Sequence, residues 1–531
     1  MRKEVGNKEA NTRKQAFKSP GMSEQTANNK RIAKNTLLLY VRMLLIMVVS
    51  LWTSRVIMQA LGVEDYGIHN VVGGVVTMFT MLSGTLSASI SRFITFELGK
   101  GDIRRLKVVF SSSITIQLGL SLLVLLLAET VGLWFLNQKM VIPSERLYAA
   151  NWVYQFSVLA FIVNLISVPY HATIVAHERM ATFAYISIVD ASLRLLSAYL
   201  VMVSPGDRLI VYAFLLTLSA LLVRMLYTWY CKREFEECTY RFMLDRPLLK
   251  QMFSFAGWNF IGATSGLLRD QGGNILMNLF FGPMVNAARA IAFQVNIAVN
   301  AFVTNFMTAL NPQITKSFAT GDTAYLMTLL YKGARFSYFI LLLLSLPVLA
   351  NTHFLLLLWL REVPDYAVSF VQLSLLLSMC ECFSIPLVTA MLATGQIRNY
   401  QIVVGGFQLL NLPISYLFLK WGYAPEAVFV VAIFISQCCF LLRIYMLRSM
   451  IGLSVRTFLR KVYLNIISVT LGAAAFPLWL SSRLEESWGS FFALLAVSEG
   501  LSFAAIYVLG CETEERSFIK SKVKSFMKSK T

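Results

Sequence analysis

Residues 339–360 read FILLLLSLPVLANTHFLLLLWL, an apolar run too long for the surface of a water-soluble protein. Similar runs stand at 36–52 and 118–136. Together with its neighbours, each run is long enough to cross about 30 Å of hydrocarbon as a helix. The chain of 531 residues is 57% hydrophobic and 14% charged, whereas soluble domains carry about 25% charged residues. We therefore predict a polytopic membrane protein.

The apolar runs divide the chain into about fourteen transmembrane helices. Backbone polar groups in lipid must be satisfied within each segment, and no ten-residue alternation typical of a barrel is visible. The expected fold class is therefore all-α. The predicted spans lie near 36–60, 68–95, 108–136, 147–174, 182–203, 209–231, 252–280, 286–315, 333–352, 366–394, 402–419, 427–446, 463–481 and 491–511.

The basic residues between these spans predict the orientation. Connections on one side carry 32 Lys and Arg, and those on the other carry six. Because basic connections stay in the cytoplasm, both termini are expected there. This asymmetry accounts for most of the net charge of +19, which favours contact with anionic membrane lipids over nucleic-acid binding.

A short phrase occurs twice, as SRFITFELGKGD at 91–102 and NPQITKSFATGD at 311–322. Shifting the spans by the same 220 residues superimposes six helices of the first half on six of the second, which predicts a parallel repeat of two lobes. Gly101 and Gly321 are expected to cap the two helices, and the Asp after each to form a turn.

The repeat divides the chain into six expected regions. They are a basic cytoplasmic tail at 1–35, an N-lobe of spans 1–6 at 36–231, a cytoplasmic bridge at 232–251, a C-lobe of spans 7–12 at 252–446, a linker with spans 13 and 14 at 447–511, and a second basic cytoplasmic tail at 512–531.

Charged residues inside the spans are the candidates for function. A charge at the bilayer centre costs about 3 kcal/mol, so such residues normally face the bundle interior or a wet cavity. Four arginines lie close enough to the cytoplasmic face to reach it with their side chains, namely Arg42, Arg224, Arg335 and Arg443. The span arginines are Arg42, Arg55, Arg92, Arg194, Arg224, Arg269, Arg289, Arg335 and Arg443, and the acids are Glu129, Asp190, Asp270, Glu381 and Glu499.

The strongest candidates for a binding site come from spans 1 and 2 of the first lobe and from the corresponding spans 7 and 8 of the second. Arg55, Arg92, Arg269 and Arg289 are expected to line a cationic cavity, and His69 stands at the repeat position of Arg289. The planar guanidinium binds phosphate through two hydrogen bonds and stays charged at any pH. The pattern favours an anionic substrate, and the alternative is pairing between helices.

Four further residues are candidates for ion coupling or charge pairing. Asp270, Glu381 and Asp190 could carry protons or sodium. Arg194 stands four residues after Asp190, so the two can pair on one helix face. A structural pair and a functional site both remain open there.

Enzymatic motifs are missing from the sequence. No phosphate-binding GxxxxGK[ST] loop and no HExxH motif occurs, and the seven cysteines lack zinc-ligand spacing. We therefore expect a transporter that is not an enzyme, without a cofactor or a bound metal.

Several of these stretches carry a family likeness. SRVIMQALGVEDYGIHNVVGGVV at 54–76, SASISRFITFELGKGD at 87–102 and LPVLANTHFLLLLWL at 346–360 resemble Wzx-type polysaccharide and O-antigen flippases. These lipopolysaccharide biosynthesis proteins belong to the multidrug/oligosaccharidyl-lipid/polysaccharide exporter superfamily. The resemblance implies two six-helix lobes with a V-shaped outline, a central cationic cavity and alternating access.

The same resemblance implies a substrate and a place. The substrate would be undecaprenyl-diphosphate-linked oligosaccharide for lipopolysaccharide, capsule or other surface polysaccharide, moved across the inner membrane of a Gram-negative bacterium. Related lipid II flippases use arginines on the first, second and eighth helices, where Arg55, Arg92 and Arg289 lie here. Partnership with a glycan polymerase or ligase stays open.

Two rival functions remain. The first is a cation-coupled exporter of small amphiphiles or drugs, although span 36–60 lacks the acid that such antiporters carry on their first helix. The second is a membrane-embedded glycan polymerase or acyltransferase, for which the short connections leave little catalytic surface.

Overall fold

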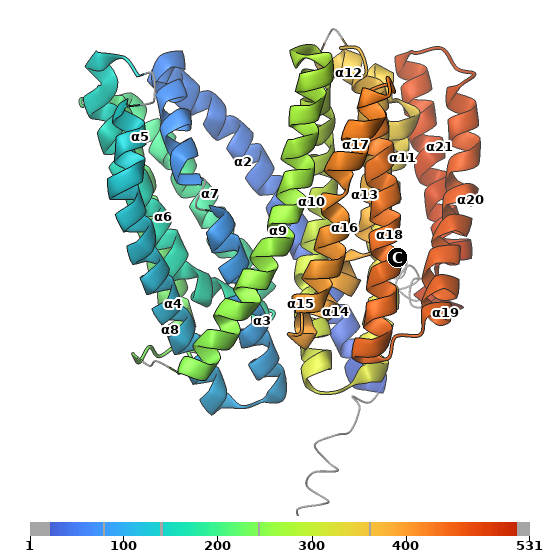
Figure 1. The fold of residues 1–531 in the computed structure, drawn as a ribbon, viewed down its shortest axis with the longest axis horizontal. Helices are drawn as coiled ribbons and strands as arrows, with labels where there is room; N and C mark the ends of the chain where they lie inside the picture. The colour runs from blue at the N-terminus through green and yellow to red at the C-terminus, as the bar shows by residue number, and fades with distance from the viewer. Residues whose placement is uncertain are drawn as a thin grey trace, which may run out of the picture. The chain divides into compact units, whose positions relative to one another are not determined.

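The computed structural model describes residues 22–77, 80–138, 142–242, 245–360, 363–513 and 515–517. Every regular element in these ranges is a helix (Figure 1). The all-α fold class predicted from the sequence is therefore confirmed. The chain divides into two compact units: unit 1 comprises 1–260 and 311–322, and unit 2 comprises 261–310 and 323–531. The predicted lobe boundaries remain a prediction.

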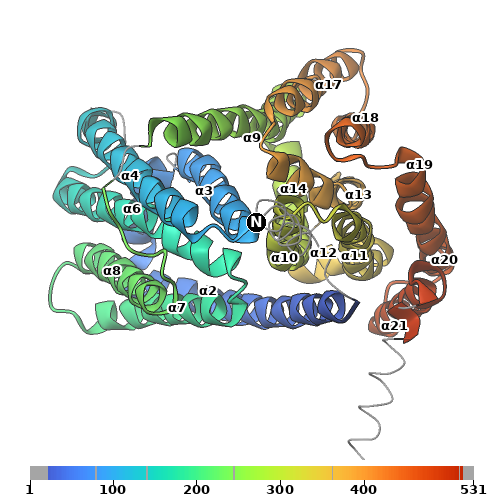
Figure 2. The same ribbon diagram turned by 90° about the horizontal axis from the view of Figure 1, so that it is seen from below.

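Unit 1 is built on four long helices that pack side by side (Figures 1 and 2). These are α2 (Met22–Thr77), α6 (Leu147–Ala176), α7 (Met180–Val203) and α8 (Arg208–Glu234). The helices α3 (Thr80–Lys100), α4 (Ile103–Leu127) and α5 (Leu133–Gln138) complete the unit, with the first part of α9 (Arg246–Phe281) and the last part of α10 (Pro283–Ala319).

Unit 2 holds the rest of α9 and α10 and all later helices. Near its C-terminal end, α20 and α21 pack against each other and against α11 (Figure 2). The later helices are α11 (Thr323–Ala350), α12 (Thr352–Leu360), α13 (Ala367–Cys382), α14 (Ile385–Thr394), α15 (Arg398–Tyr400), α16 (Gly406–Leu409), α17 (Asn411–Lys420), α18 (Ala427–Ile451), α19 (Val455–Phe458), α20 (Leu464–Ser481) and α21 (Trp488–Ala505).

The helices are apolar enough to cross a membrane. Within the described residues, 11 helices pass this test by length and composition, or 12 if the bent pair α13 and α14 forms one span. Twelve of the predicted spans coincide with these helices. The remaining two, 68–95 and 252–280, fall on the end of α2 with α3 and on α9, which do not pass.

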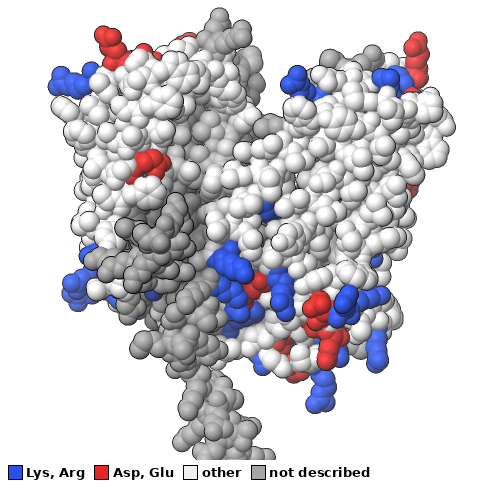
Figure 3. Space-filling model, turned by 180° about the vertical axis from the view of Figure 1, so that it is seen from behind, with Lys and Arg blue, Asp and Glu red and all other residues white. Residues whose placement is uncertain are grey.

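The outward-facing side chains match a lipid environment. Leu122, Leu126, Val131 and Trp134, on or near α4 and α5, are each more than half exposed. Figure 3 shows one face that is largely uncharged, with charged side chains gathered near its ends. Such apolar exposure would promote aggregation in water but suits hydrocarbon. The protein is therefore a multi-pass membrane protein.

The 220-residue repeat is visible in the backbone. Gly62 and Gly282 have φ of +81° and +79°, and Gly101 and Gly321 both have φ of +74°. Glycine adopts this left-handed conformation at little cost because it lacks Cβ. Gly101 follows α3, and Asp102 then caps α4 by accepting a 3.0 Å hydrogen bond from the backbone N–H of Arg105. The predicted helix-ending role of the repeated phrase is confirmed.

These glycines generate the first prediction. A Cβ added at Gly101 would meet nothing within 4 Å, so Gly101→Ala changes only the backbone energy. We expect it to lower stability by roughly 1–2 kcal/mol, measured as thermal unfolding in detergent. Gly119→Ala is the matched control: the site is equally open but lies inside helix α4, where alanine should stabilise by about 0.5–1 kcal/mol. Equal destabilisation by both changes would contradict the backbone explanation.

Candidate functional site

Three of the predicted site residues form one ion cluster in unit 2. Arg269 and Asp270 are neighbours on α9, and Glu381 lies on α13. The Arg269 guanidinium donates from Nη1 to Glu381 Oε1 at 2.6 Å and from Nε to Asp270 Oδ1 at 3.0 Å. Its side chain is only 19% exposed. Two carboxylates thus contact one partly buried arginine, so the charge of Arg269 is compensated within the protein.

Arg289 of α10 lies beside this cluster but is held differently. Its Nη2 donates to the backbone carbonyl of Asp270 at 3.1 Å, and its guanidinium lies 5.4 Å from the ring centroid of Phe429. Within the described ranges, no carboxylate forms an ion pair with Arg289. Carbonyl dipoles and aromatic faces stabilise a cation only in part. Within the described residues, Arg289 therefore lacks the direct carboxylate partners that Arg269 has.

A glycine explains how the two helices accommodate Arg289. A Cβ at Gly273 would lie 2.6 Å from Nη2 of Arg289, closer than atoms normally approach. Gly273 stands one helical turn after Asp270, on the same side of α9. The absence of a side chain there leaves room for the guanidinium to reach the Asp270 carbonyl.

The other predicted cationic residues lie in unit 1, each against aromatic rings. Arg55 is exposed, with its guanidinium 5.9 Å from the Trp52 ring. Arg92 stands 4.6 Å from the ring of Phe93 and 4.7 Å from that of Phe96. The prediction that all of these residues line one cavity therefore stays a prediction; the described contacts join only the group in unit 2.

His69 also lies in unit 1, edge-on to Tyr212 with 5.0 Å between the ring centroids. Its repeat counterpart Arg289 has Phe429 as its aromatic neighbour. Each of the two repeat positions thus has an aromatic neighbour of its own, but one position carries an imidazole and the other a guanidinium.

Asp190 and Arg194 line a cavity of about 560 Å³ in unit 1. Arg194 Nε lies 3.2 Å from both carboxylate oxygens of Asp190, so the pair forms as the four-residue spacing predicts. The cavity lies among α2, α6, α7 and α8, and Arg42 also lines it. The sequence did not single out Arg42, because its position near the cytoplasmic face suggested a side chain reaching the surface. Its guanidinium instead lies 4.3 Å from the ring of Phe183.

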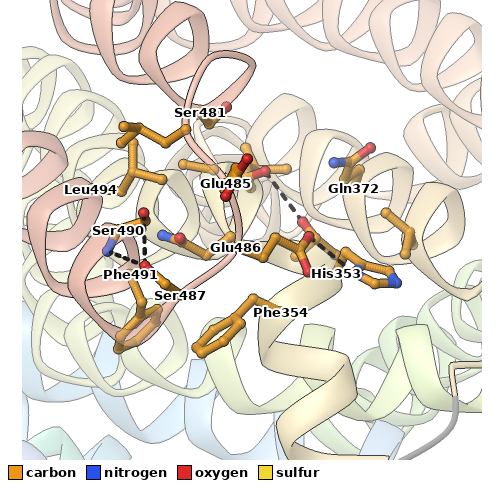
Figure 4. Close-up of a pocket in the computed structure, with 16 residues that line it drawn as sticks. His353, Phe354, Gln372, Ser481, Glu485, Glu486, Ser487, Ser490, Phe491 and Leu494 are labelled. Carbon is orange, nitrogen blue, oxygen red and sulfur yellow. Dashed lines mark hydrogen bonds and ion pairs between the residues drawn. The ribbon is translucent and has the colours of Figure 1, made fainter.

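A smaller polar pocket of about 170 Å³ lies in unit 2, between the start of α12 and the connection from α20 to α21 (Figure 4). His353 Nδ1 lies 2.8 Å from Glu486 Oε2, and the Ser487 hydroxyl accepts from the backbone N–H of Ser490. Glu485 also lines the pocket. The sequence analysis missed this site because its groups come from distant segments and form no local motif.

Comparisons with known proteins agree with this architecture. Residues 32–318 match a protein family described as polysaccharide biosynthesis protein. A relative from Bacillus subtilis (strain 168), the uncharacterized membrane protein EpsK, is 22% identical over 305 residues, which are 57% of this chain and 60% of the relative. The chain therefore spans about 60% of the length of this curated relative.

Solved structures of membrane transporters share the fold. MATE in its bent conformation superimposes with a TM-score of 0.70 at 12% identity, covering 80% of this chain and 96% of the other. An outward-facing multidrug resistance MATE family transporter of the MOP superfamily gives 0.68 at 13% identity, with the same coverage. A MOP superfamily transporter from Pyrococcus furiosus, described as having a binding pocket of reverse polarity, gives 0.66 at 12% identity, covering 79% and 96%.

At these identities the structural matches establish the fold alone, which is that of the MATE transporters. The family match is independent evidence and covers more than half of the 531 residues. It confirms the resemblance found in the sequence: the chain belongs to the polysaccharide biosynthesis protein family.

Proposed function

We propose that the protein is a flippase that moves undecaprenyl-diphosphate-linked oligosaccharide across the bacterial inner membrane by alternating access. Both termini would lie in the cytoplasm, and the glycan would serve lipopolysaccharide, capsule or another surface polysaccharide. The observation that carries the proposal is Arg289, an arginine in a candidate membrane span that is held by a carbonyl and an aromatic ring.

The chemistry of Arg289 fits a diphosphate. An arginine inside a membrane costs free energy unless it finds an opposite charge or water. A diphosphate offers oxygens to the planar guanidinium, which binds them through charge-assisted hydrogen bonds. The apolar lipid tail could remain in the bilayer, so that no apolar surface of the tail has to be exposed to water during transport.

Arg269 has a different role in this proposal. Its ion pairs with Asp270 and Glu381 hold two acids beside Arg289. Protonation of either acid would weaken the ion pair between that acid and Arg269. It would also make the net charge of the cluster near the substrate more positive by one. Asp270 and Glu381 are therefore the proposed coupling groups.

An alternative function is the export of small amphiphiles coupled to a cation. The 560 Å³ cavity in unit 1 favours it, because Asp190 places an acid among apolar side chains such as Ile46 and Leu216. A cavity of this volume can hold a small molecule, and its lining combines polar groups such as Asn164 and Ser187 with these apolar side chains. Increased drug susceptibility of a deletion strain with normal surface glycan would support this function.

The first test of the proposal removes the charge of Arg289. We expect Arg289→Ala to reduce surface polysaccharide at least about tenfold in a deletion strain, because a hydrogen bond to a charged group contributes about 1.5–3 kcal/mol. Arg289→Lys should restore part of the export. Surface glycan is quantified by immunoblot beside membrane levels of the protein. Arg483→Ala is the control, since Arg483 is an exposed connecting residue near Trp479. Normal glycan in Arg289→Ala would refute the proposal.

The second test separates Arg269 from Arg289. Arg269→Met leaves Asp270 and Glu381 unpaired, so we expect a loss of about 2 kcal/mol in stability. This is less than the roughly 3–5 kcal/mol of a fully buried pair, because the two acids are 41% and 35% exposed. Adding Glu381→Gln should recover about half of the loss, measured by thermal unfolding of the purified protein. Strictly additive losses would show that the pair contributes nothing.

A further inference from the structure

The two copies of the repeated phrase meet in unit 1. The phrases end α3 and α10, and both ends belong to this unit. A Cβ at Gly99 would lie 3.0 Å from Cβ of Ala319 and 3.1 Å from Cα of Lys316. The rings of Phe96 and Phe318 stand 6.3 Å apart. Gly99 and Ala319 are separated by 220 residues, so a residue packs against its own repeat counterpart.

One buried carboxylate holds the end of α10 in this position. Glu178 lies in the turn between α6 and α7, and its side chain is 2% exposed. It accepts from Arg31 Nε at 2.8 Å, Gln313 Nε2 at 2.7 Å and Lys316 Nζ at 2.7 Å. Asn35 donates to its backbone carbonyl at 3.4 Å. Glu178 thus joins α2, the α6–α7 turn and the end of α10.

The backbone at Glu178 favours a different residue. Its φ is +58°, a left-handed conformation that glycine adopts readily and glutamate does not. The corresponding turn of the second half, after α14, has Gly395 with φ of +77°. A side chain kept against this conformational preference indicates a role for its carboxylate.

The neighbouring residue fixes the same turn to the bridge between the halves. His177 Nε2 lies 2.5 Å from Glu237 Oε1, and its ring stacks on Phe235 with 4.1 Å between centroids. Burial alone would raise the pKa of Glu237, but hydrogen bonds from His177 and the backbone hold that pKa below its ordinary value. These contacts fix the position of the turn that carries Glu178.

A proline interrupts the hydrogen bonding of helix α10 just before the residues that Glu178 contacts. Its residues up to Leu310 belong to unit 2, and those from Asn311 belong to unit 1. Pro312 lies at this boundary inside the helix. Proline lacks the N–H that would bond the preceding turn, so helices bend at such positions. The missing hydrogen bond should make the end of α10 easier to displace than the end of an uninterrupted helix.

We infer that Glu178 is a conformational latch. It holds the end of α10 against α3 in this conformation and releases it in another state of the transport cycle. The inference rests on the proposed function only for the existence of an alternating-access cycle. Ionic contacts suit such a latch, because a few short hydrogen bonds break together and re-form in one arrangement.

A cross-linking experiment tests the closed contact. Gly99→Cys and Ala319→Cys are introduced into the full-length protein, and disulfide formation under mild oxidation is followed by peptide mass spectrometry. Adding Glu178→Gln should slow the reaction about tenfold or more, equivalent to about 1.4 kcal/mol. Adding Glu486→Gln instead should leave the rate unchanged, because Glu486 pairs with His353 in unit 2. An unchanged rate with Glu178→Gln would overturn the latch.

Hydrogen exchange tests the same contact without new cysteines. In the purified protein, Glu178→Gln should accelerate amide exchange across 311–319 relative to the native chain. Exchange in α21 should stay the same in both proteins. Equal exchange across 311–319 in the variant and the native chain would also overturn the inference, even if the cysteine pair disturbs folding.

An export assay separates a latch from a permanent connection. Oxidation of the Gly99→Cys, Ala319→Cys protein should stop surface-glycan export, and a reductant should restore it. The control pair is Ser197→Cys with Ser219→Cys, whose hydroxyl oxygens lie 3.2 Å apart between α7 and α8, and its oxidation should not affect export. Export by the fully cross-linked protein would refute the latch and leave the flippase standing. Absence of glycan export by the native chain would refute the flippase, while the cross-linking and exchange results would still decide the latch.

Discussion

The cost of an ionised group in a low-dielectric interior is the constraint on which this structure depends. Several charged groups in both units meet it with partners from distant helices. Arg335 of α11, with its side chain 3% exposed, pairs with Glu515 at 2.9 Å and with Glu512 at 3.3 Å. These two ion pairs connect the segment after α21 to α11. Arg269 and Glu178 follow the same rule. Ion pairs thus fix contacts between helices whose apolar faces alone would not specify a partner.

Arg289 is a place where this rule is only partly fulfilled. Its neighbour Arg269 has two carboxylates, whereas Arg289 has a carbonyl and the face of Phe429. In the proposed function, this difference separates an arginine that joins two helices from one that binds the substrate, although the two look alike in the sequence. Within the described residues of unit 2, Arg289 is thus a guanidinium without a carboxylate ion pair. It lies beside a cluster whose two acids and one arginine carry a net charge of −1 when all three are ionised.

Hydropathy and glycine positions could be predicted because both depend on local sequence. A span is apolar along its own length, and a left-handed residue after a helix calls for glycine. The partners of the charges could not be predicted, since Arg269 and Glu381 are 112 residues apart and their contact depends on how α9 and α13 pack. The role of Glu178 could not be predicted for the same reason. In the sequence it is one acid in a short connection, and its hydrogen-bond donors come from the distant helices α2 and α10.

The repeat shows how one backbone plan acquires different chemistry in its two copies. Gly101 and Gly321 keep the same φ, so both phrases end their helices alike. Other corresponding positions have diverged, and His69 corresponds to Arg289 at the offset of 220. Where the second half has Gly395 in a left-handed turn, the first half has Glu178 and its ion cluster. The two halves thus share the backbone turns that end their helices, while the side chains at other corresponding positions differ in charge and in the partners they can bind.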